Sequence, residues 1–259
     1  MNTKVAEAVG TTIEELQDVI EYDDTQKQEV KYEVKENNDI KYLVANKRPN
    51  VVLRAINLFF KRIIDIIGAI VGIIFLIPIT IGVYIANKKV KDDGPVFYCH
   101  KRIGKNGKYF NMYKFRTMVV DSDERLAKLL EEDEEARKEW EENRKLKNDP
   151  RITKIGSFLR KTSLDEFPQF INVLKGDMSI VGPRAVVDGE IEKFGIYKKE
   201  ILSVKPGITG YWAANGRSDT SYEERVFMEY KYVRLFSVWM DIKILFKTVA
   251  SVLKKEGAV

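Results

Sequence analysis

Apolar residues are concentrated in one long stretch of the chain, residues 63–86, which reads IIDIIGAIVGIIFLIPITIGVYIA. About 20 apolar residues are enough to cross a hydrocarbon core about 30 Å thick, so this stretch is long enough to enter a membrane. It carries one charge, Asp65, near its start and a proline, Pro78, in its second half. Because proline removes a backbone donor and crowds the preceding turn, we expect the helix to kink or break at Ile77–Pro78.

Basic residues flank this stretch on both sides. They are Lys47, Arg48, Arg54, Lys61 and Arg62 before it and Lys88, Lys89 and Lys91 after it. A spanning helix normally carries most of its basic flank on the cytoplasmic side alone. The pattern therefore favours a re-entrant helix–break–helix with both ends in the cytoplasm, and its alternative is a single kinked spanning helix.

The pattern divides the chain into three parts. Residues 1–50 are polar and weakly periodic, so we expect a tail that contains at most a short helix, at Thr12–Ile20. Residues 51–92 form the membrane segment. A turn cluster, Asp92–Pro95, ends that segment, and we expect residues 93–259 to form a soluble domain.

Two short aromatic runs within the soluble domain, Val96–Tyr98 and Tyr109–Phe115, flank the pair Asn106–Gly107. Asn-Gly between such runs is a strong hairpin signal, so we expect a small β-hairpin. The hairpin would carry four cations, for which a solvated basic surface is the alternative to a binding role: Lys101, Arg102, Lys114 and Arg116.

Two further segments have helical patterns. Asp121–Lys147 is highly charged, and we expect a single helix with a solvated face, capped by Asp121 and Glu124. Residues 238–253 place apolar side chains at helical spacing, with lysines on other faces. Such an amphipathic helix either lies in the headgroup plane of a membrane or packs on the domain core. The predicted fold class is α+β, mainly helical, with a re-entrant membrane helix, a β-hairpin and interfacial amphipathic helices.

The amino-acid composition limits the partners and metal sites that the chain can have. The 259 residues carry a net charge of +5, which suits a phosphate-bearing partner. Cys99 is the only cysteine and His100 the only histidine, so the chain forms no internal disulfide and no Cys/His zinc site. A bound metal would have to be a hard cation held by oxygen, such as Mg²⁺.

Chemistry-bearing side chains are densest in residues 156–184, GSFLRKTSLDEFPQFINVLKGDMSIVGPR. We expect a helix here that Ser163 caps and Gly176 ends, which places the acids Asp165 and Glu166 in its first turn. Alternatively Asp165 is itself the cap, since a proline follows shortly after it.

The surroundings of these acids favour an ionised carboxylate. The helix dipole stabilises negative charge at this end, and Arg160 and Lys161 precede the acids. Asp165 could then attack phosphorus as a nucleophile, while Glu166 holds magnesium or moves a proton. The alternative is a purely structural capping box, because Ser163 and Glu166 have that spacing.

Three motifs together resemble the bacterial sugar transferase family, the monotopic phosphoglycosyl transferases. They are KFRTM at 114–118, RKTSLDEFPQFINVLKGDMSIVGPR at 160–184 and KPGITG at 205–210, and the resemblance runs from about Lys61 to the C-terminus. It implies transfer of a sugar 1-phosphate from a UDP-sugar to undecaprenyl phosphate. UMP is released and a polyprenyl-diphosphate sugar forms, which starts polysaccharide or exopolysaccharide synthesis.

The resemblance also implies residue roles. Asp165 would form a covalent intermediate, and Glu166 would act with Mg²⁺ on the acceptor, so both acids are the predicted metal ligands. Lys61 and Arg62 would lie near lipid headgroups, and the membrane helix would break at Pro78. We predict five substrate-phosphate ligands: Lys114, Arg116, Arg160, Arg184 and Arg102.

Two positions depart from the family pattern. Ile77 stands where many members have serine before the breaking proline, and Ala185 stands where many have proline after GPR. A serine hydroxyl could satisfy a freed backbone carbonyl at the break, whereas isoleucine lacks one. We expect Ala185 to alter a loop rather than the chemistry.

The implied partners are a UDP-sugar, polyprenyl phosphate and a membrane, with the catalytic domain on the cytoplasmic face of the bacterial inner membrane. No nucleic-acid motif is present in the sequence, and the oligomeric state is open, a homodimer included. Galactose or glucose is weakly favoured over acetamido sugars, and residues 216–225 are a candidate for that choice. The alternative function is a non-catalytic membrane-attached protein that binds anionic lipid or nucleic acid, or a scaffold.

Overall fold

The computed structural model describes residues 20–23, 28–37, 40–45, 50–143, 146–215 and 220–254. Its strands are β1 (Ile20–Asp23), β2 (Gln28–Asn37), β3 (Ile40–Ala45), β4 (Phe97–Ile103), β5 (Tyr109–Phe115), β6 (Ser179–Val181) and β7 (Gly207–Thr209). Its α-helices are α2 (Val51–Lys89), α3 (Ser122–Glu132), α4 (Glu134–Asn143), α5 (Lys154–Lys161), α6 (Gln169–Lys175), α7 (Lys198–Ile201), α8 (Tyr211–Asn215), α9 (Tyr222–Leu235) and α10 (Val238–Leu253). Short 3₁₀ helices occupy η2 (Lys105–Gly107), η3 (Leu164–Glu166) and η4 (Ile191–Tyr197). The mainly helical fold with a few strands is confirmed.

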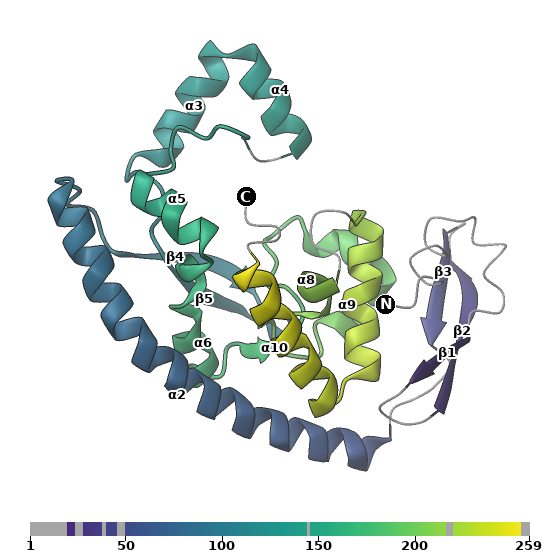
Figure 1. The fold of residues 1–259 in the computed structure, drawn as a ribbon. Coiled ribbons are helices and arrows are strands. Elements are labelled where there is room, and N and C mark those ends of the chain that lie inside the picture. The colour runs from purple at the N-terminus through teal and green to yellow at the C-terminus, as the bar shows by residue number, and fades with distance from the viewer. Residues whose placement is uncertain are drawn as a thin grey trace.

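Helix α2 forms a long arc along one side of the domain (Figure 1). Its 39 residues correspond to about 58 Å at 1.5 Å per residue. Within the described part of the chain, it is the one helix long and apolar enough to cross a membrane. Asn50 caps its start by accepting from the backbone N–H groups of Val52 and Leu53.

The predicted break at Ile77–Pro78 is wrong at the level of secondary structure, because α2 continues through Pro78. Proline removes one helical hydrogen bond, but the turns on both sides keep theirs. Leu76 and Val83 also anchor both halves against the same cluster as Phe115, and this packing holds the helix together. The outcome is a curved helix rather than two separate ones (Figure 1).

Several polar side chains in the first half of α2 face the domain instead of solvent. Arg54 Nη1 donates to the carbonyl of Val233 at 3.0 Å, and Asn57 Oδ1 accepts from the backbone N–H of Val238 at 3.0 Å. The carboxylate of Asp65 is 4% exposed and accepts from both Ser179 and Ile180. This one charge inside the apolar stretch therefore fixes strand β6 against the helix.

The outer face of α2 is apolar along its length. Ile67, Ile74 and Phe75 are 59%, 61% and 58% exposed, respectively. An apolar face of this extent is unfavourable in water and indicates contact with lipid or with another apolar surface. The helix is thus amphipathic with its polar side turned inward.

The predicted hairpin is confirmed. Strands β4 and β5 pair antiparallel from Phe97↔Phe115 to Ile103↔Tyr109. Between them η2 places Asn106 and Gly107 at positive φ, which is the backbone conformation that an Asn-Gly turn supplies. The strands are longer than the aromatic runs suggested, because β4 continues through the cationic residues to Ile103.

The predicted single helix over Asp121–Lys147 is instead two helices. Asp133 separates α3 from α4 with an extended backbone, and Asp121 makes no side-chain capping bond. Figure 1 shows the pair as a helical hairpin that projects from the domain. The break lies within the acidic run EEDEE, where like charges on successive turns disfavour a continuous helix.

Residues 1–50 contain regular structure that we did not predict. Strands β1, β2 and β3 form an antiparallel sheet in the order β1-β2-β3. The sequence signal was present in the strict alternation of Val30, Tyr32 and Val34 with charged residues. The short helix expected at Thr12–Ile20 lies outside the described residues except for Ile20, which is in β1.

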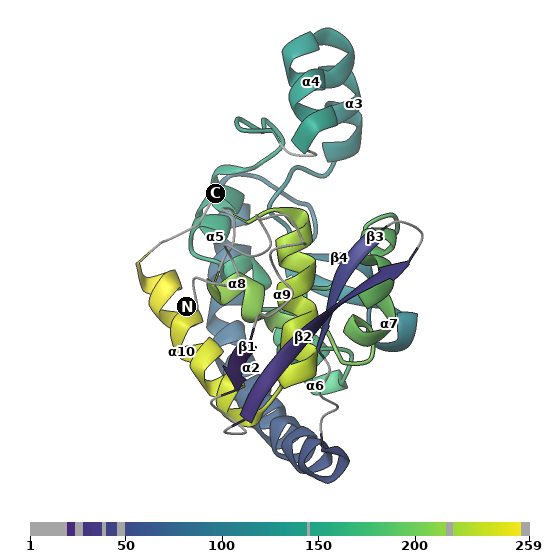
Figure 2. The same ribbon diagram turned by 90° about the vertical axis from the view of Figure 1, so that its right-hand side faces the viewer.

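The C-terminal helix combines both predicted behaviours. The Asp241 and Ile244 side chains are buried, whereas Trp239, Phe246 and Val249 are exposed. Helix α10 contacts α2, α8, β6 and β7, and Figure 2 shows it along the edge of the domain. It therefore packs on the core through one face and leaves a second apolar face uncovered.

Candidate active site

The two acids meet the hairpin at Lys114. The Lys114 Nζ donates to Glu166 Oε1 at 2.8 Å and lies 3.8 Å from Asp165 Oδ2. Lys114 comes from β5, whereas both acids lie on η3, so the fold joins two motifs that are about fifty residues apart in the sequence. The structure thus brings the two acids and the hairpin cation into contact with one another.

Helix α5 brings a second cation to the acids. Gly156 lies so close to the backbone that follows β5 that a Cβ there would be 1.9 Å from the carbonyl oxygen of Thr117. The same approach lets Arg160 Nε donate to Thr117 Oγ1 at 3.0 Å. From there the guanidinium acts electrostatically on Asp165, whose pKa it lowers. A glycine is therefore required at position 156 for the placement of Arg160.

Helix capping at the acids differs from the prediction. Ser163 has φ of 55° and makes no side-chain capping bond, so neither the Ser163 cap nor the capping box forms. The acids lie in η3, and Pro168 stands at the start of α6, where its missing N–H is tolerated. At the other end Gly176 closes α6 in the left-handed conformation, as predicted.

The two acids differ in their exposure and in the direction of their pKa shifts. The Asp165 side chain is 14% exposed and that of Glu166 is 35% exposed. Burial raises the pKa of Asp165 above its usual value, and Lys114 and Arg160 offset only part of this. For Glu166 burial also raises the pKa, but Lys114 and Arg184 outweigh it and the net pKa is lowered. The sequence argument for a depressed Asp165 pKa is therefore wrong, because it did not include desolvation.

A tight crossing of two loops positions Arg184. Gly182 and Gly207 approach so closely that a Cβ on Gly207 would lie 2.1 Å from the backbone nitrogen of Gly182. Gly207 N donates to Pro183 O, and Gly182 N donates to Thr209 O. The motifs GPR and KPGITG thus form one structural unit whose glycines allow backbones to touch.

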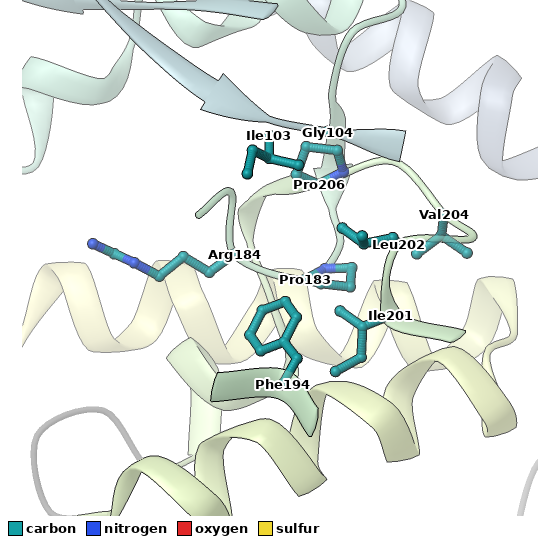
Figure 3. A pocket seen from close by; sticks show the side chains of 9 residues that line it. All are labelled: Ile103, Gly104, Pro183, Arg184, Phe194, Ile201, Leu202, Val204 and Pro206. Atoms are coloured by element: carbon teal, nitrogen blue, oxygen red, sulfur yellow. The ribbon is translucent and has the colours of Figure 1, made fainter. Parts of the chain in front are cut away.

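Arg184 itself is exposed and lies close enough to Glu166 to lower the pKa of that acid. Figure 3 shows its side chain pointing away from the small cavity beneath the loop. That cavity is lined mainly by apolar residues such as Phe194 and Ile201 and has a volume of about 10 Å³. It has room for at most one water, so it is a packing defect rather than a substrate site.

Arg102 on β4 lies near Arg184 and Glu166. Its guanidinium faces Glu190, at 4.0 Å from Nη1 to Oε2, and hydrogen-bonds the His100 ring. Arg184 and Glu166 both act electrostatically on Arg102. The site therefore brings together four of the five predicted phosphate ligands: Lys114, Arg160, Arg184 and Arg102.

Arg116 has a different role. Its almost fully buried side chain donates to Pro95 O, Met118 O and Asp92 Oδ1. These contacts fasten the turn that follows α2 to the end of β5. Because its guanidinium is engaged in this way, we remove Arg116 from the set of phosphate ligands.

The lysine and arginine expected at lipid headgroups also have protein partners. Lys61 Nζ contacts Asp241 Oδ2 at 2.6 Å and Val181 O at 2.7 Å. Arg62 donates to Val173 O and Leu174 O at the C-terminal end of α6. Both side chains dock α2 onto the domain, which argues against a primary role at the headgroups.

Four further residues lie near the site. Tyr222 and Arg225 belong to the segment 216–225 that the sequence offered as a candidate for the choice of sugar, whereas Trp212 and Glu229 were not predicted. Arg225 lies between the rings of Trp212 and Tyr222, at 4.7 and 5.2 Å from their centroids. Glu229, one turn further along α9, is 2% exposed and accepts from the backbone N–H of Arg184 at 3.1 Å. The available signal was an Arg and a Glu four residues apart on a helix that is otherwise rich in apolar and aromatic residues.

The donor set allows a magnesium ion only in part. No cluster of three or more Asp, Glu, His or Cys side chains that could hold a metal is found among the described residues. Asp165 and Glu166 supply two carboxylates, and Mg²⁺ commonly binds one or two carboxylates together with substrate phosphates. The site thus fits a magnesium ion shared with substrate rather than one held by protein alone.

Comparison with known proteins matches residues 56–255 to the model of a family described as bacterial sugar transferase. The chain belongs to the bacterial sugar transferase family. The family resemblance inferred from the motifs is therefore confirmed, and its match includes the acids, the cations and both apolar helices.

Three relatives indicate the range of this family. The chain is 50% identical over 200 residues to an undecaprenyl-phosphate galactose phosphotransferase of Salmonella typhimurium, with 77% of this chain and 42% of the relative covered. It is 42% identical to the exopolysaccharide production protein ExoY of Rhizobium meliloti, with 80% of this chain and 91% of the relative covered. A UDP-glucose:undecaprenyl-phosphate glucose-1-phosphate transferase of Escherichia coli is 41% identical to it, with 76% of this chain and 41% of the relative covered. The chain thus spans about two fifths of the length of some relatives and most of the length of another.

Proposed function

We propose that the protein transfers a sugar 1-phosphate from a UDP-sugar to undecaprenyl phosphate, releasing UMP and starting polysaccharide synthesis. The observation that carries this proposal is the pair Asp165 and Glu166 among Lys114, Arg160 and Arg184, on a domain docked to α2. Cations around a buried acid are suited to a diphosphate, and the apolar face of α2 is suited to a lipid. The names of the Salmonella and E. coli relatives support the same acceptor.

In the proposed first step, a carboxylate oxygen of Asp165 attacks the sugar-side phosphorus of the UDP-sugar. A new P–O bond to Asp165 forms as the anhydride P–O bond breaks, and UMP leaves with that electron pair. An oxygen of undecaprenyl phosphate then attacks the same phosphorus and displaces Asp165. Lys114, Arg160 and Arg184 bind phosphate oxygens and offset the charge that spreads over them during transfer.

Glu166 acts beside the nucleophile. Its low pKa keeps it ionised, and its bond to Lys114 fixes that cation 3.8 Å from Asp165. Gln169 adds a second hydrogen bond to Glu166 from the start of α6. Asp165 and Glu166 would hold Mg²⁺ together with phosphate oxygens, and the ion would offset phosphate charge there.

We propose that α2 is re-entrant, with both ends on the cytoplasmic face of the bacterial inner membrane. Polar contacts dock α2 to the domain at Arg54 and Asp65, and apolar contacts dock it at Leu76 and Val83. A helix held along its length by a domain with a charged surface is not free to pass straight through hydrocarbon. The exposed apolar faces of α2 and α10 support insertion into one leaflet.

The decisive experiment measures UMP release from UDP-sugars by the protein in detergent or nanodiscs. Wild type should release UMP and label undecaprenyl phosphate with sugar phosphate, whereas Asp165→Asn should lose at least about 10³-fold in rate. Glu166→Gln should lose roughly 100-fold and require more magnesium, as expected for a lost acid–base or metal-binding group. Arg125→Lys, on the projecting α3, is the matched control and should keep full activity.

Two results would overturn the proposal. Near-normal turnover by a folded Asp165→Asn protein would remove the covalent mechanism. An absence of UMP release by wild type with every UDP-sugar tested, despite binding to anionic vesicles, would favour the alternative of a non-catalytic membrane-attached protein. A binding protein of that kind predicts graded, salt-sensitive association instead.

A further inference from the structure

A buried arginine lies next to the phosphate site without acceptors for two of its donors. Arg225 is 9% exposed, and its Nε and Nη2 atoms are buried without a hydrogen-bond partner. In a guanidinium these two N–H groups are parallel and form the edge that binds a pair of oxygens. The arginine thus presents a complete bidentate fork.

Aromatic side chains fix the direction of this fork. The ring of Trp212 lies 4.7 Å and that of Tyr222 lies 5.2 Å from the guanidinium carbon. Trp212 is itself held by a hydrogen bond from Nε1 to Thr220 Oγ1 at 2.8 Å. A guanidinium held between two rings is preorganised, so little rotamer freedom is lost when it binds a ligand.

An acceptor without a partner accompanies the donors. Glu229 is one helical turn from Arg225 on α9, and its Oε2 atom is buried with no hydrogen-bond partner, although Oε1 accepts from Arg184 N. Arg225 and Glu229 interact electrostatically without forming a hydrogen bond. A buried donor pair and a buried acceptor that miss each other are costly, unless a third group with both donors and acceptors joins them.

This cluster adjoins the reacting groups. Arg184 acts electrostatically on Arg225, on Glu229 and on Glu166. The backbone N–H of Arg184 also donates to Glu229 Oε1 at 3.1 Å, so this residue adjoins the α9 cluster directly. Its electrostatic influence on Glu166 links the same residue to the acids.

We propose that Arg225 and Glu229 form the subsite that reads the hydroxyl groups of the transferred sugar, an inference that rests on the proposed function. Two neighbouring sugar oxygens accept from the fork of Arg225, and one sugar hydroxyl donates to Glu229 Oε2. Tyr222 packs its ring against the guanidinium at 5.2 Å and donates from its hydroxyl to Glu190 O at 3.3 Å, so it borders the proposed subsite.

A sugar fits this cluster better than a phosphate does. Glu229 and Glu190 both lie close enough to Arg225 to act on it electrostatically. Two carboxylates near the guanidinium would repel a phosphate. Hydroxyl groups offer donors and acceptors together, as the unpartnered atoms require. Recognition at this distance from the reacting phosphorus would set the choice among sugars while leaving the chemistry unchanged.

The test compares sugar preference among wild type, Arg225→Lys and Glu229→Gln with a panel of UDP-hexoses and UDP-acetamidohexoses. In both variants kcat/KM for the preferred donor should fall by about 100-fold, and the preference between 4-epimers should shrink by about 10-fold or more. Inhibition by UMP, which lacks the sugar, should change by less than about threefold. Arg234→Lys on the same helix, whose guanidinium faces Glu200, is the control and should keep the wild-type preference.

The outcomes separate this inference from the proposed function. If wild type releases UMP and both folded variants keep its preference among sugars, the subsite assignment is wrong while the transferase proposal stands. If the variants weaken UMP inhibition as much as donor use, the cluster only positions Arg184 and the assignment is again wrong. Should Arg225→Lys fail to fold, Glu229→Gln decides, because its amide oxygen still accepts from Arg184 N.

Discussion

At the residue scale, one lysine contacts two adjacent acids that differ in their exposure to solvent. Lys114 makes a short hydrogen bond to Glu166 and a longer ion pair to Asp165. Burial raises the pKa of both acids. The hydrogen bond and charge of Lys114 bring the net pKa of Glu166 below its usual value, whereas the longer contact leaves the pKa of Asp165 raised. A less solvated carboxylate is the better nucleophile once ionised, which is consistent with the proposed attack by Asp165 and the proposed supporting role of Glu166.

The buried Glu229 predicts a pH dependence of stability. Burial raises its pKa to about 7 from 4.5, although the N–H of Arg184 and the charge of Arg225 oppose this. Between these values the folded protein keeps a proton that the unfolded chain has lost. The free energy of unfolding should therefore fall as pH rises through this window, by at most about 3 kcal/mol, and level off above it.

Denaturation of wild type and Glu229→Gln at about pH 5 and about pH 7.5 measures this effect. The variant should lose part of the downward slope, because glutamine does not titrate. Identical slopes in the two proteins would show that Glu229 has an ordinary pKa in the folded state.

At the element scale, α2 docks through small residues and inward polar groups. Gly68 and Gly72 allow Ile180 and Phe170 to approach the helix backbone closely, since a Cβ on either glycine would lie under 2.5 Å from them. Helix α6 follows the acids directly, and Phe170 belongs to it. The packing of α6 on α2 therefore links α2 to the position of Asp165.

Substitution of the helix glycines tests this link. A Cβ on Gly72 would lie 2.4 Å from the Phe170 ring, whereas one on Gly82 meets nothing within 4 Å. We expect Gly72→Ala to cost about 1–3 kcal/mol of stability and to lower turnover, because the ring and its helix must shift. Gly82→Ala, on the same helix, should change neither quantity, as thermal unfolding and UMP release would report. Equal effects of the two substitutions would contradict the proposed docking.

At the scale of the whole molecule, the apolar outer faces of α2 and α10 and the cationic site belong to one domain. A site that joins a soluble diphosphate to a lipid phosphate must lie near the membrane surface. If α2 inserts into a bilayer as proposed, its docking along the domain holds that domain at the bilayer surface without a linker. A straight passage of α2 through the membrane would separate one of its ends from the domain.

Cysteine labelling tests this topology. In a Cys99→Ser background, which removes the exposed native thiol, we expect Val51→Cys and Asp93→Cys to resist an impermeant maleimide in intact cells. Both positions should label after permeabilisation, which also serves as the control for accessibility. Labelling of a single position from outside would show a spanning helix and overturn the re-entrant arrangement.

Local chemistry made several features predictable from sequence. The length and apolarity of α2, the Asn-Gly hairpin and the end of α6 at Gly176 depend on neighbouring residues alone. The association of the acids with Lys114 and Arg184 followed from motifs shared with a known family. The alternation of apolar and charged residues in β2 was also visible in the sequence. The low overall hydrophobicity of residues 1–50 led us to expect a polar tail there instead.

The sequence by itself determined that this chain has a helix long and apolar enough to enter a membrane, and a set of acids and cations suited to phosphate chemistry. Only the tertiary structure decided which cations serve that cluster, because a guanidinium or ammonium binds whichever carbonyl or carboxylate the fold brings within reach. Arg116, Lys61 and Arg62 were redirected in this way to structural partners. The fold also raised the pKa of Asp165 and buried Arg225 and Glu229, since burial depends on packing between distant segments rather than on sequence neighbours.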